Sequence, residues 1–311
     1  MHCNNQIRTI CRVVHENRAP EISTVNLTVD IQQRRIIFMK TIKYLTVFCM
    51  MICMIMQLNI NVSANENNIC YVAHRGYTKY APENSIPAFE AAGKEGFQAV
   101  ECDIHETAKD KKGKRRFVIM HDQTLNRMCG LYGKNVYQKK LTYQKIRNKY
   151  YIKTGNNIES YTKKQLRIPS LEEYLNICKR YHMKPVIEIK QKMKKDTIKR
   201  LYQSLKKAKM QNQAVVTCKY KQQLTYMRKY ARKMPLEYVR HDFTQNDLSW
   251  MKKYHINVSI NKNILSDDMI QLFETNNIKI NIWTINNKDQ LYNFTNKGIK
   301  IVTSDDALWK E

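Results

Sequence analysis

The sequence predicts an α/β protein with a single TIM (β/α)8 barrel, and three observations lead to this expectation. Short β-rich runs alternate with helical stretches from residue 69 to the end of the chain, as in βαβ units with a parallel sheet. Removing the first 64 of the 311 residues leaves 247, close to the ~250 that such a barrel takes. Charged side chains also stand at the ends of apolar runs, where these barrels carry their active sites.

Two N-terminal segments are predicted to precede the barrel domain, which covers residues 65–311. Residues 1–38 show no strong periodicity, and we expect a disordered upstream extension or a misassigned start. Residues 39–64 begin with two lysines, continue with the apolar run Tyr44–Met56 and end in Val-Ser-Ala, the layout of a secretory signal peptide. The alternative is an uncleaved membrane anchor, although the run is shorter than the ~20 residues of a span. We expect a secreted, extracellular or cell-surface protein, membrane-anchored if the signal is retained.

The predicted strands number one more than the eight that a barrel needs. They are Ile69–Ala73, Gln98–Ile104, Phe117–Met120, Pro185–Lys190, Ala214–Cys218, Leu236–Val239, Asn257–Ile260, Ile278–Ile285 and Ile299–Asp305. The gap between Asp103 and Phe117 is too short for a crossover helix. We therefore expect the 117–120 run, or one terminal run, not to be an ordinary strand of the barrel.

Helix signals and one weakly patterned stretch complete the domain. Asn84–Gly96 is predicted as a helix with Asn84 as its N-cap. Ser170–His182 is predicted as a helix that opens with a capping box of Ser170 and Glu173. Residues 130–168 are polar, and we expect an insertion after the 117–120 strand that covers one end of the barrel.

The composition points to anionic surroundings. The chain has 54 Lys and Arg against 27 Asp and Glu, a net charge of +27. Such a charge favours a phospholipid or wall-polymer surface, or nucleic acid. The lysines are spread along the chain and no zinc-finger, phosphate-loop or RNA-binding signature occurs, so we expect no nucleic-acid partner.

Five cysteines follow Ala64, namely Cys70, Cys102, Cys129, Cys178 and Cys218. Their number is odd and they include no CxxC pair. A chain of this length can build its own core, so we expect buried thiols rather than a disulfide framework.

Acidic residues interrupt two of the apolar runs. Glu101 and Asp103 share one face of their strand, and Glu188 and Lys190 share one face of theirs, because alternate residues of a strand point the same way. Buried carboxylates are costly unless they are paired or bind a metal. Three of them in one volume would suit Ca²⁺ or Mg²⁺, which prefer hard oxygen ligands. The alternative is structural salt bridging, for example between Glu101 and Lys190.

Two histidines end apolar runs beside a charged residue. His74 follows the first run and His121 follows the 117–120 run. Histidine can give or take a proton near neutral pH. Arg75, directly after His74, has the fork of donors that suits phosphate oxygens.

These motifs together resemble the glycerophosphodiester phosphodiesterase family, which belongs to the phospholipase C-like TIM barrels. The matching text is AHRGYTKYAPENS, then ECDIHE, FVIMHDQTLNR and PVIEIK, and the likeness resumes at NIWTINN and GIKIVTSDD. The order of the separated motifs matches the family. One departure is the hairpin Thr107–Arg116, which is longer and more basic than the family's compact turn.

The resemblance implies roles for eight side chains. His74 and His121 would act as general base and acid, Arg75 and Lys190 would bind phosphate, Trp283 would wall the substrate pocket unless it only packs in the core, and Glu101, Asp103 and Glu188 would hold the metal.

The implied activity is metal-dependent hydrolysis of glycerophosphodiesters to glycerol 3-phosphate and an alcohol. The substrate would be a small anionic diester or a glycerol-phosphate polymer, with attraction to an anionic membrane or wall surface. Two alternatives stay open. One is a phospholipase-type lyase of the same barrel acting on intact lipids, and the other is a cationic secreted protein that binds wall polymers.

Overall fold

The computed structural model describes residues 34–46, 48 and 69–310. The chain divides into two compact units, residues 1–66 and 67–311. In the first unit the described residues are helical, and no described helix is both long and apolar enough to cross a membrane. Most of the predicted extension 1–38 and of the signal segment 39–64 lies outside the described residues, so both assignments stay predictions.

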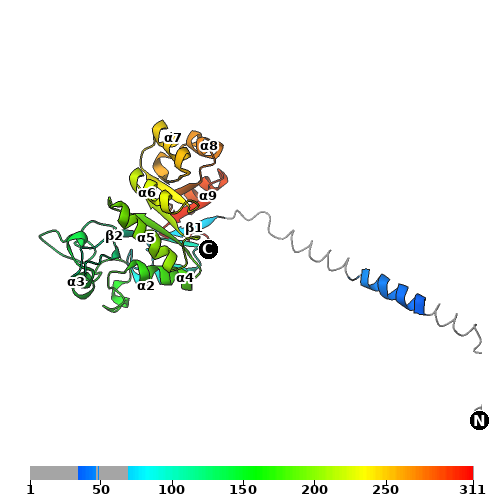
Figure 1. Ribbon diagram of the computed structural model, residues 1–311, viewed down its shortest axis with the longest axis horizontal. Helices are drawn as coiled ribbons and strands as arrows, with labels where there is room; N and C mark the ends of the chain where they lie inside the picture. The colour runs from blue at the N-terminus through cyan, green and yellow to red at the C-terminus, as the bar shows by residue number, and fades with distance from the viewer. Residues whose placement is uncertain (1–33, 47, 49–68, 311) are drawn as a thin grey trace, which may run out of the picture. The chain divides into compact units, whose positions relative to one another are not determined.

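The second unit is a barrel whose eight parallel strands close on themselves (Figure 1). The neighbours run in the order β1, β9, β8, β7, β6, β5, β4, β2, and β2 pairs back with β1. The strands of this barrel are β1 (Cys70–Ala73), β2 (Ala99–Glu106), β4 (Lys184–Ile189), β5 (Val215–Cys218), β6 (Leu236–Arg240), β7 (Asn257–Asn261), β8 (Ile280–Trp283) and β9 (Ile301–Ser304). The predicted (β/α)8 fold is confirmed.

The extra strand is β3 (Phe117–Ile119), which pairs antiparallel with β2. The short connection between them forms a hairpin and not a crossover, as the sequence spacing requires. The expectation that the 117–120 run is no ordinary barrel strand is therefore confirmed.

The helices pack around the outside of the barrel. They are α2 (Ile86–Glu95), α4 (Leu171–Arg180), α5 (Lys195–Lys207), α6 (Lys221–Tyr230), α7 (Gln245–Tyr254), α8 (Asp267–Thr275) and α9 (Lys288–Asn296). The predicted capping box opens α4, where the Ser170 hydroxyl accepts from the Glu173 backbone and the Glu173 carboxylate accepts in return. Tyr174 of α4 reaches into the sheet, and its buried hydroxyl donates to the Val100 carbonyl at 2.6 Å.

The predicted cap of α2 is wrong by one residue. Ser85 is the N-cap, and its hydroxyl accepts from the Ala88 backbone N–H at 3.1 Å. Asn84 is in the left-handed region at φ 53°, and its side chain bonds to a carboxylate of the barrel instead. Both residue types cap helices well, so the tertiary contact decides between them.

The insertion between β3 and α4 has a small core of its own. It carries α3 (Tyr143–Lys149) and the short 3₁₀ turns η1 (Gln138–Lys140) and η2 (Ile158–Ser160). Apolar side chains gather under these elements, namely Val118, Met120, Leu125, Met128, Cys129, Ile146, Ile152, Leu166 and Ile168. In Figure 1 α3 lies at the opposite end of the domain from α7 and α8. The insertion, which was expected to be a polar segment, therefore buries an apolar core of its own.

The alternation of β2 separates the core from the site. Val100, Cys102 and Ile104 are fully buried in the main core beneath the helices, and Glu101 and Asp103 point to the other face, as predicted. The five cysteines after Ala64 are free thiols. Four of them are buried as expected, and Cys70 is half-buried.

Candidate active site

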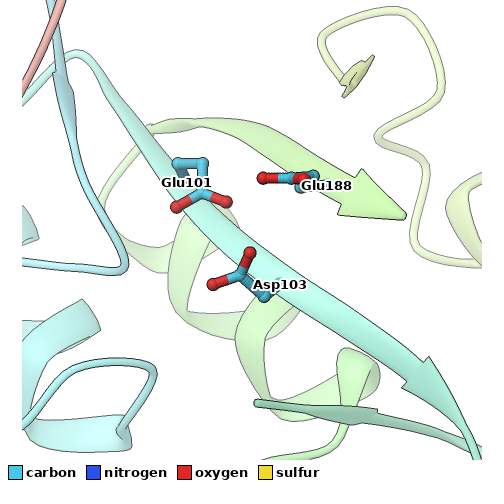
Figure 2. Close-up of side chains that lie close together, drawn as sticks. All are labelled: Glu101, Asp103 and Glu188. Carbon is cyan, nitrogen blue, oxygen red and sulfur yellow. The ribbon is translucent and has the colours of Figure 1, made fainter. Parts of the chain in front are cut away.

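Three carboxylates meet inside the carboxyl end of the barrel. Glu101 and Asp103 come from β2 and Glu188 from the adjacent β4, where the strand register places Asp103 beside Glu188. One oxygen from each residue lies within 4.8 Å of the other two, and Figure 2 shows the three groups turned toward one another. Because the two strands are parallel and pair directly, residues far apart in the chain share one small volume.

The electrostatics of this cluster are unfavourable without a cation. Burial, with Asp103 and Glu188 close by, raises the pKa of Glu101 well above its usual value. Burial and Asp103 likewise raise the pKa of Glu188. Within the described chain, Glu101 Oε1 is buried and has no hydrogen-bond partner. Three hard oxygen donors with one orphaned atom fit a Ca²⁺ or Mg²⁺ ion.

Two cations of the chain flank the carboxylates. The Lys190 ammonium lies 3.0 Å from Glu188 and 3.4 Å from Asp103, and the Arg75 guanidinium lies 3.5 Å from Asp103. Burial of Asp103 is outweighed by Lys190 and Arg75, so its pKa is lowered. The alternative of structural salt bridging is therefore realised at Asp103 and Glu188, while Glu101 keeps an unpaired oxygen.

The loop after β1 hydrogen-bonds the carboxylate cluster through one backbone N–H group and the side-chain amide of Asn84. The Arg75 backbone N–H donates to Glu101 at 2.9 Å. Asn84 holds Asp103 from two sides, since its amide donates to the carboxylate at 2.7 Å and accepts from the Asp103 backbone at 3.2 Å. Gly76 has φ +88°, and a Cβ there would lie 2.7 Å from the backbone carbon of Ala88 in α2. The glycine is needed both for its backbone angle and for this close approach.

His74 is oriented by a carboxylate from the other end of the chain. Its Nδ1 lies 2.8 Å from Asp305, which also accepts from Thr78 at 2.8 Å and from Asn286 at 2.6 Å. Although burial opposes it, the bonds from His74 and Asn286 lower the pKa of Asp305 to about 2. The ionised Asp305 carboxylate accepts a hydrogen bond from Nδ1–H, so Nε2 of neutral His74 carries the free lone pair and is the basic nitrogen.

His121 has the same arrangement with its neighbour in the chain. Its Nδ1 lies 2.9 Å from Asp122, and Arg127 donates to the same carboxylate at 2.7 Å. Burial is opposed by these bonds, and the pKa of Asp122 falls to about 2. Burial lowers the pKa of His121 itself, with Lys190 adding to the effect and Asp103 opposing it.

One ion network joins the two halves of the site. Glu83 accepts from Arg75 at 3.2 Å and from Arg127 at 2.8 Å, so it links Arg75 to the arginine that holds Asp122. His74 and Arg75 line a cavity of about 530 Å³ with Glu83, Asn156, Asn286 and Asp305. His121 is not part of that wall in the described residues, but Arg75 and Glu83 line the cavity with His74 and also interact electrostatically with His121.

Trp283 is the last residue of β8, at its carboxyl end. It shares the inward face with Asn281, whose side chain bonds within the barrel. Its ring packs edge-on against His241 at 4.8 Å, and its buried Nε1–H has no acceptor among the described residues. The residue lies at the mouth of the barrel, where either a wall of the pocket or a packing role fits.

The sequence did not identify five residues that hold the site in place, namely Asn84 as a clamp, His105, Asp122, Arg127 and Asp305. His105 is buried and lies 3.3 Å from the backbone carbonyl of His121 and 3.2 Å from Gln191. Asp122 and Arg127 stand inside the HDQTLNR text, which was a usable signal. Asp305 stands inside the GIKIVTSDD text, but its pairing with His74 could not be foreseen, because the two residues are 231 positions apart.

Comparison with known proteins finds a matching family and similar folds. The sequence profile of the glycerophosphoryl diester phosphodiesterase family matches residues 74–308. A solved phosphodiesterase of Oleispira antarctica, in complex with sn-glycerol-3-phosphate, has a TM-score of 0.66 at 20% identity over 76% of this chain and 92% of that one. A glycerophosphodiester phosphodiesterase of Parabacteroides distasonis gives 0.63 at 20% identity over 78% and 94%.

Similarity to curated sequences is more limited in extent. Glycerophosphodiester phosphodiesterase 1 of mouse is 28% identical over 42% of this chain, and the match spans 37% of that protein's length. A glycerophosphodiester phosphodiesterase of Bacillus subtilis (strain 168) is 24% identical over 75% of this chain and 82% of its own. With the profile covering most of the barrel domain, this chain belongs to the glycerophosphoryl diester phosphodiesterase family.

Proposed function

We propose that the protein hydrolyses glycerophosphodiesters to glycerol 3-phosphate and an alcohol, with a divalent metal ion and two histidines as proton donor and acceptor. The observation that carries the proposal is the cluster of Glu101, Asp103 and Glu188, whose oxygens lie within 4.8 Å of one another beside Arg75 and Lys190. Family membership and the relatives named for this activity support it.

The three carboxylates would hold the ion, either Ca²⁺ or Mg²⁺. When bound, the ion supplies Lewis-acid stabilisation of the negative charge on the phosphoryl oxygens. Arg75 and Lys190 would turn donors toward the same oxygens, which fits their place at the edge of the cluster. Their present bonds to Asp103 and Glu188 keep both side chains extended toward the site.

The histidines would divide the proton transfers. His74 presents Nε2 as a base because Asp305 engages its Nδ1, and it would deprotonate the nucleophile. His121 would protonate the leaving alcohol. Its lowered pKa makes the protonated form a stronger acid but a rarer one at neutral pH. The nucleophile is water or the 2-hydroxyl of the glycerol moiety, and the second choice would pass through a cyclic phosphate.

The test is release of glycerol phosphate from glycerophosphocholine by the full chain. Activity should vanish with chelator, return with Ca²⁺ or Mg²⁺, and fall at least ~100-fold in His74→Ala and His121→Ala. His182→Asn is the matched control, since His182 is exposed at φ 56° and asparagine tolerates that conformation. Near-full activity of His121→Ala would show that His121 is not the general acid. Undiminished activity in the presence of chelator would show that the reaction does not require a metal ion.

The localisation proposal remains secretion or display at the cell surface through residues 39–64. Its support is the sequence layout alone. Detection of a mature form that starts near Asn65 in the culture medium would favour cleavage, and retention of residues 39–64 in a membrane fraction would favour an anchor.

A further inference from the structure

A basic groove lies on the barrel domain, separate from the active-site cavity. It has a volume of about 1200 Å³, and ten of its 20 lining residues are Lys or Arg while three are Asp or Glu. The whole chain has 54 Lys and Arg in 311 residues, so basic residues are enriched about threefold here. A second large cavity, at the amino ends of the strands, has six basic residues among 26. Basic residues are therefore concentrated around this groove and not around the other large cavity of the domain.

Three segments form the walls of this lysine groove. They are the hairpin Thr107–Arg116, the 3₁₀ turn η1 of the insertion, and the loop and helix that follow β4, including α5. One wall residue, Gln191, follows Lys190 directly in the chain and hydrogen-bonds His105. The groove thus opens close to the carboxyl end of β4.

The walls are fixed to one another by built-in hydrogen bonds. In the hairpin, Asp110 accepts from the backbone N–H groups of Lys112 and Lys114 at 2.9 and 2.8 Å. The Ala108 backbone N–H donates to the Leu141 carbonyl at 2.8 Å, which ties the hairpin to the insertion. Glu106, at the end of β2, accepts from Arg200 and Thr197 of α5. The groove is an ordered structure rather than a collection of independent surface turns.

No carboxylate of the described residues neutralises the lysines of the groove, although Lys139 and Lys140 lie over the Tyr137 ring and Lys192 lies over the Tyr220 ring. The arginines of the groove are engaged, since Arg116 pairs with Glu172, Arg200 with Glu106, and Arg115 with the Thr107 carbonyl. Seven lysines of the groove are exposed and pair with no carboxylate of the described chain: Lys109, Lys114, Lys139, Lys140, Lys192, Lys194 and Lys207. So many ammonium groups around one hollow repel each other and favour an anion with several charges.

We propose that the lysine groove binds a linear polyanion with repeated phosphate groups. The groove is concave, which suits a strand better than a flat surface. The large exposed apolar side chains of the described barrel domain are Tyr80, Tyr132 and Tyr292, and none lines the groove, so the groove offers no side chain for insertion into a bilayer. Its one aromatic lining residue, Phe117, is buried. The half-buried Tyr137 and Tyr220 beside it are covered by groove lysines, so the groove presents no free ring on which bases of a single-stranded nucleic acid would stack.

The test measures binding of fluorescent inorganic polyphosphate to the full chain at several salt concentrations. The groove variant is Lys114→Gln/Lys140→Gln/Lys207→Gln, one exposed lysine from each wall. The matched control is Lys233→Gln/Lys279→Gln/Lys300→Gln, three exposed lysines around the other large cavity. Both variants lose the same charge. Thermal unfolding and glycerophosphocholine turnover of each variant serve as controls for folding and for the separate active site.

The groove variant should bind polyphosphate at least about tenfold more weakly, and the slope of log Kd against log salt should fall by about 2, as for three lost phosphate contacts at ~0.7 each. The control variant should keep the wild-type slope. Equal losses in both variants would assign the binding to the diffuse net charge and overturn the proposal, as would absence of polyphosphate binding. If an oligonucleotide or anionic vesicles bound more tightly than polyphosphate, and the groove variant lost that binding, the proposal would be overturned and the groove assigned to that partner.

Discussion

His74 and Asp305 lie 231 positions apart in the sequence and 2.8 Å apart in the structure. β1 and β9 are neighbours that pair from Cys70 with Ile301 to Ala73 with Ser304, so the residues after each strand meet where the barrel closes. Asp305 is bound on three sides, by His74, Thr78 and Asn286. The closure of the barrel therefore sets the tautomer and direction of a histidine proposed as the base.

Asp305→Asn should lower kcat at least about 100-fold with little change in KM, because an amide NH2 that faces His74 donates to Nδ1 and leaves the proton on Nε2, which is then no longer a base. Asp306→Asn is the matched control, since Asp306 bonds Lys79 and Tyr77 and not a histidine. Steady-state kinetics and the pH profile of both variants measure this. Equal kcat values for the two variants would show that Asp305 does not act through His74.

The contacts of Asp305 should also make the free energy of unfolding depend on pH in the acid range. A carboxyl whose folded pKa is depressed contributes stability that is present above its unfolded value, near 3.8, and is lost as pH falls toward the folded value of about 2. Asp305 is partly exposed, so we discount the contribution to about 1 kcal/mol. Denaturant unfolding between pH 5 and pH 2 should show a smaller loss for Asp305→Asn than for the wild type. If the free energies of unfolding of the two proteins fell in parallel with pH, the lowered pKa of Asp305 would be contradicted.

Glu237→Gln should stabilise the protein at alkaline pH only. Glu237 is buried in the barrel and accepts from Asn281 at 3.0 Å, and burial raises its pKa to about 7. The folded state therefore holds a proton that the unfolded state releases above about 4.5, and stability falls as pH rises from about 4.5 to 7.

The expected gain from Glu237→Gln is roughly 2–4 kcal/mol at pH 8 and close to zero at pH 4.5. Glu274→Gln is the control, because Glu274 is an exposed carboxyl that lines the same cavity at the amino ends of the strands as Glu237. This variant should leave the free energy of unfolding unchanged at both pH values. Urea unfolding at the two pH values gives the measurement. A gain that is equal at both pH values would show that packing and not titration is responsible.

Gly76→Ala should destabilise the fold by roughly 2–4 kcal/mol, because the new Cβ meets the Ala88 backbone at 2.7 Å and the angle φ +88° is itself strained. Gly133→Ala separates the two effects, since Gly133 has φ +83° with nothing within 4 Å. It should cost only about 1 kcal/mol. Thermal unfolding of both variants checks this, and equal losses would show that the contact with α2 can relax.

The part of the site that follows from strand geometry could be predicted from the sequence. The two-residue period of β2 puts Glu101 and Asp103 on one face, and the βαβ rhythm makes β4 a neighbour on which Glu188 meets them. The clamp of Asn84 on Asp103 could not be predicted, since a local pattern shows an N-cap and only the tertiary fold shows the competing carboxylate. The core of the insertion also lacked a regular period, because its apolar residues come from turns and short elements.

Calorimetric titration of the chelator-treated full chain with Ca²⁺ and with Mg²⁺ tests the metal centre most directly. The cluster predicts one site per chain, lost in each of Glu101→Gln, Asp103→Asn and Glu188→Gln. Without the ion, Glu101→Gln should be at least as stable as the wild type, because it removes a buried charge beside two others. Undiminished binding in all three variants, or full turnover by protein that binds no divalent ion, would contradict the account.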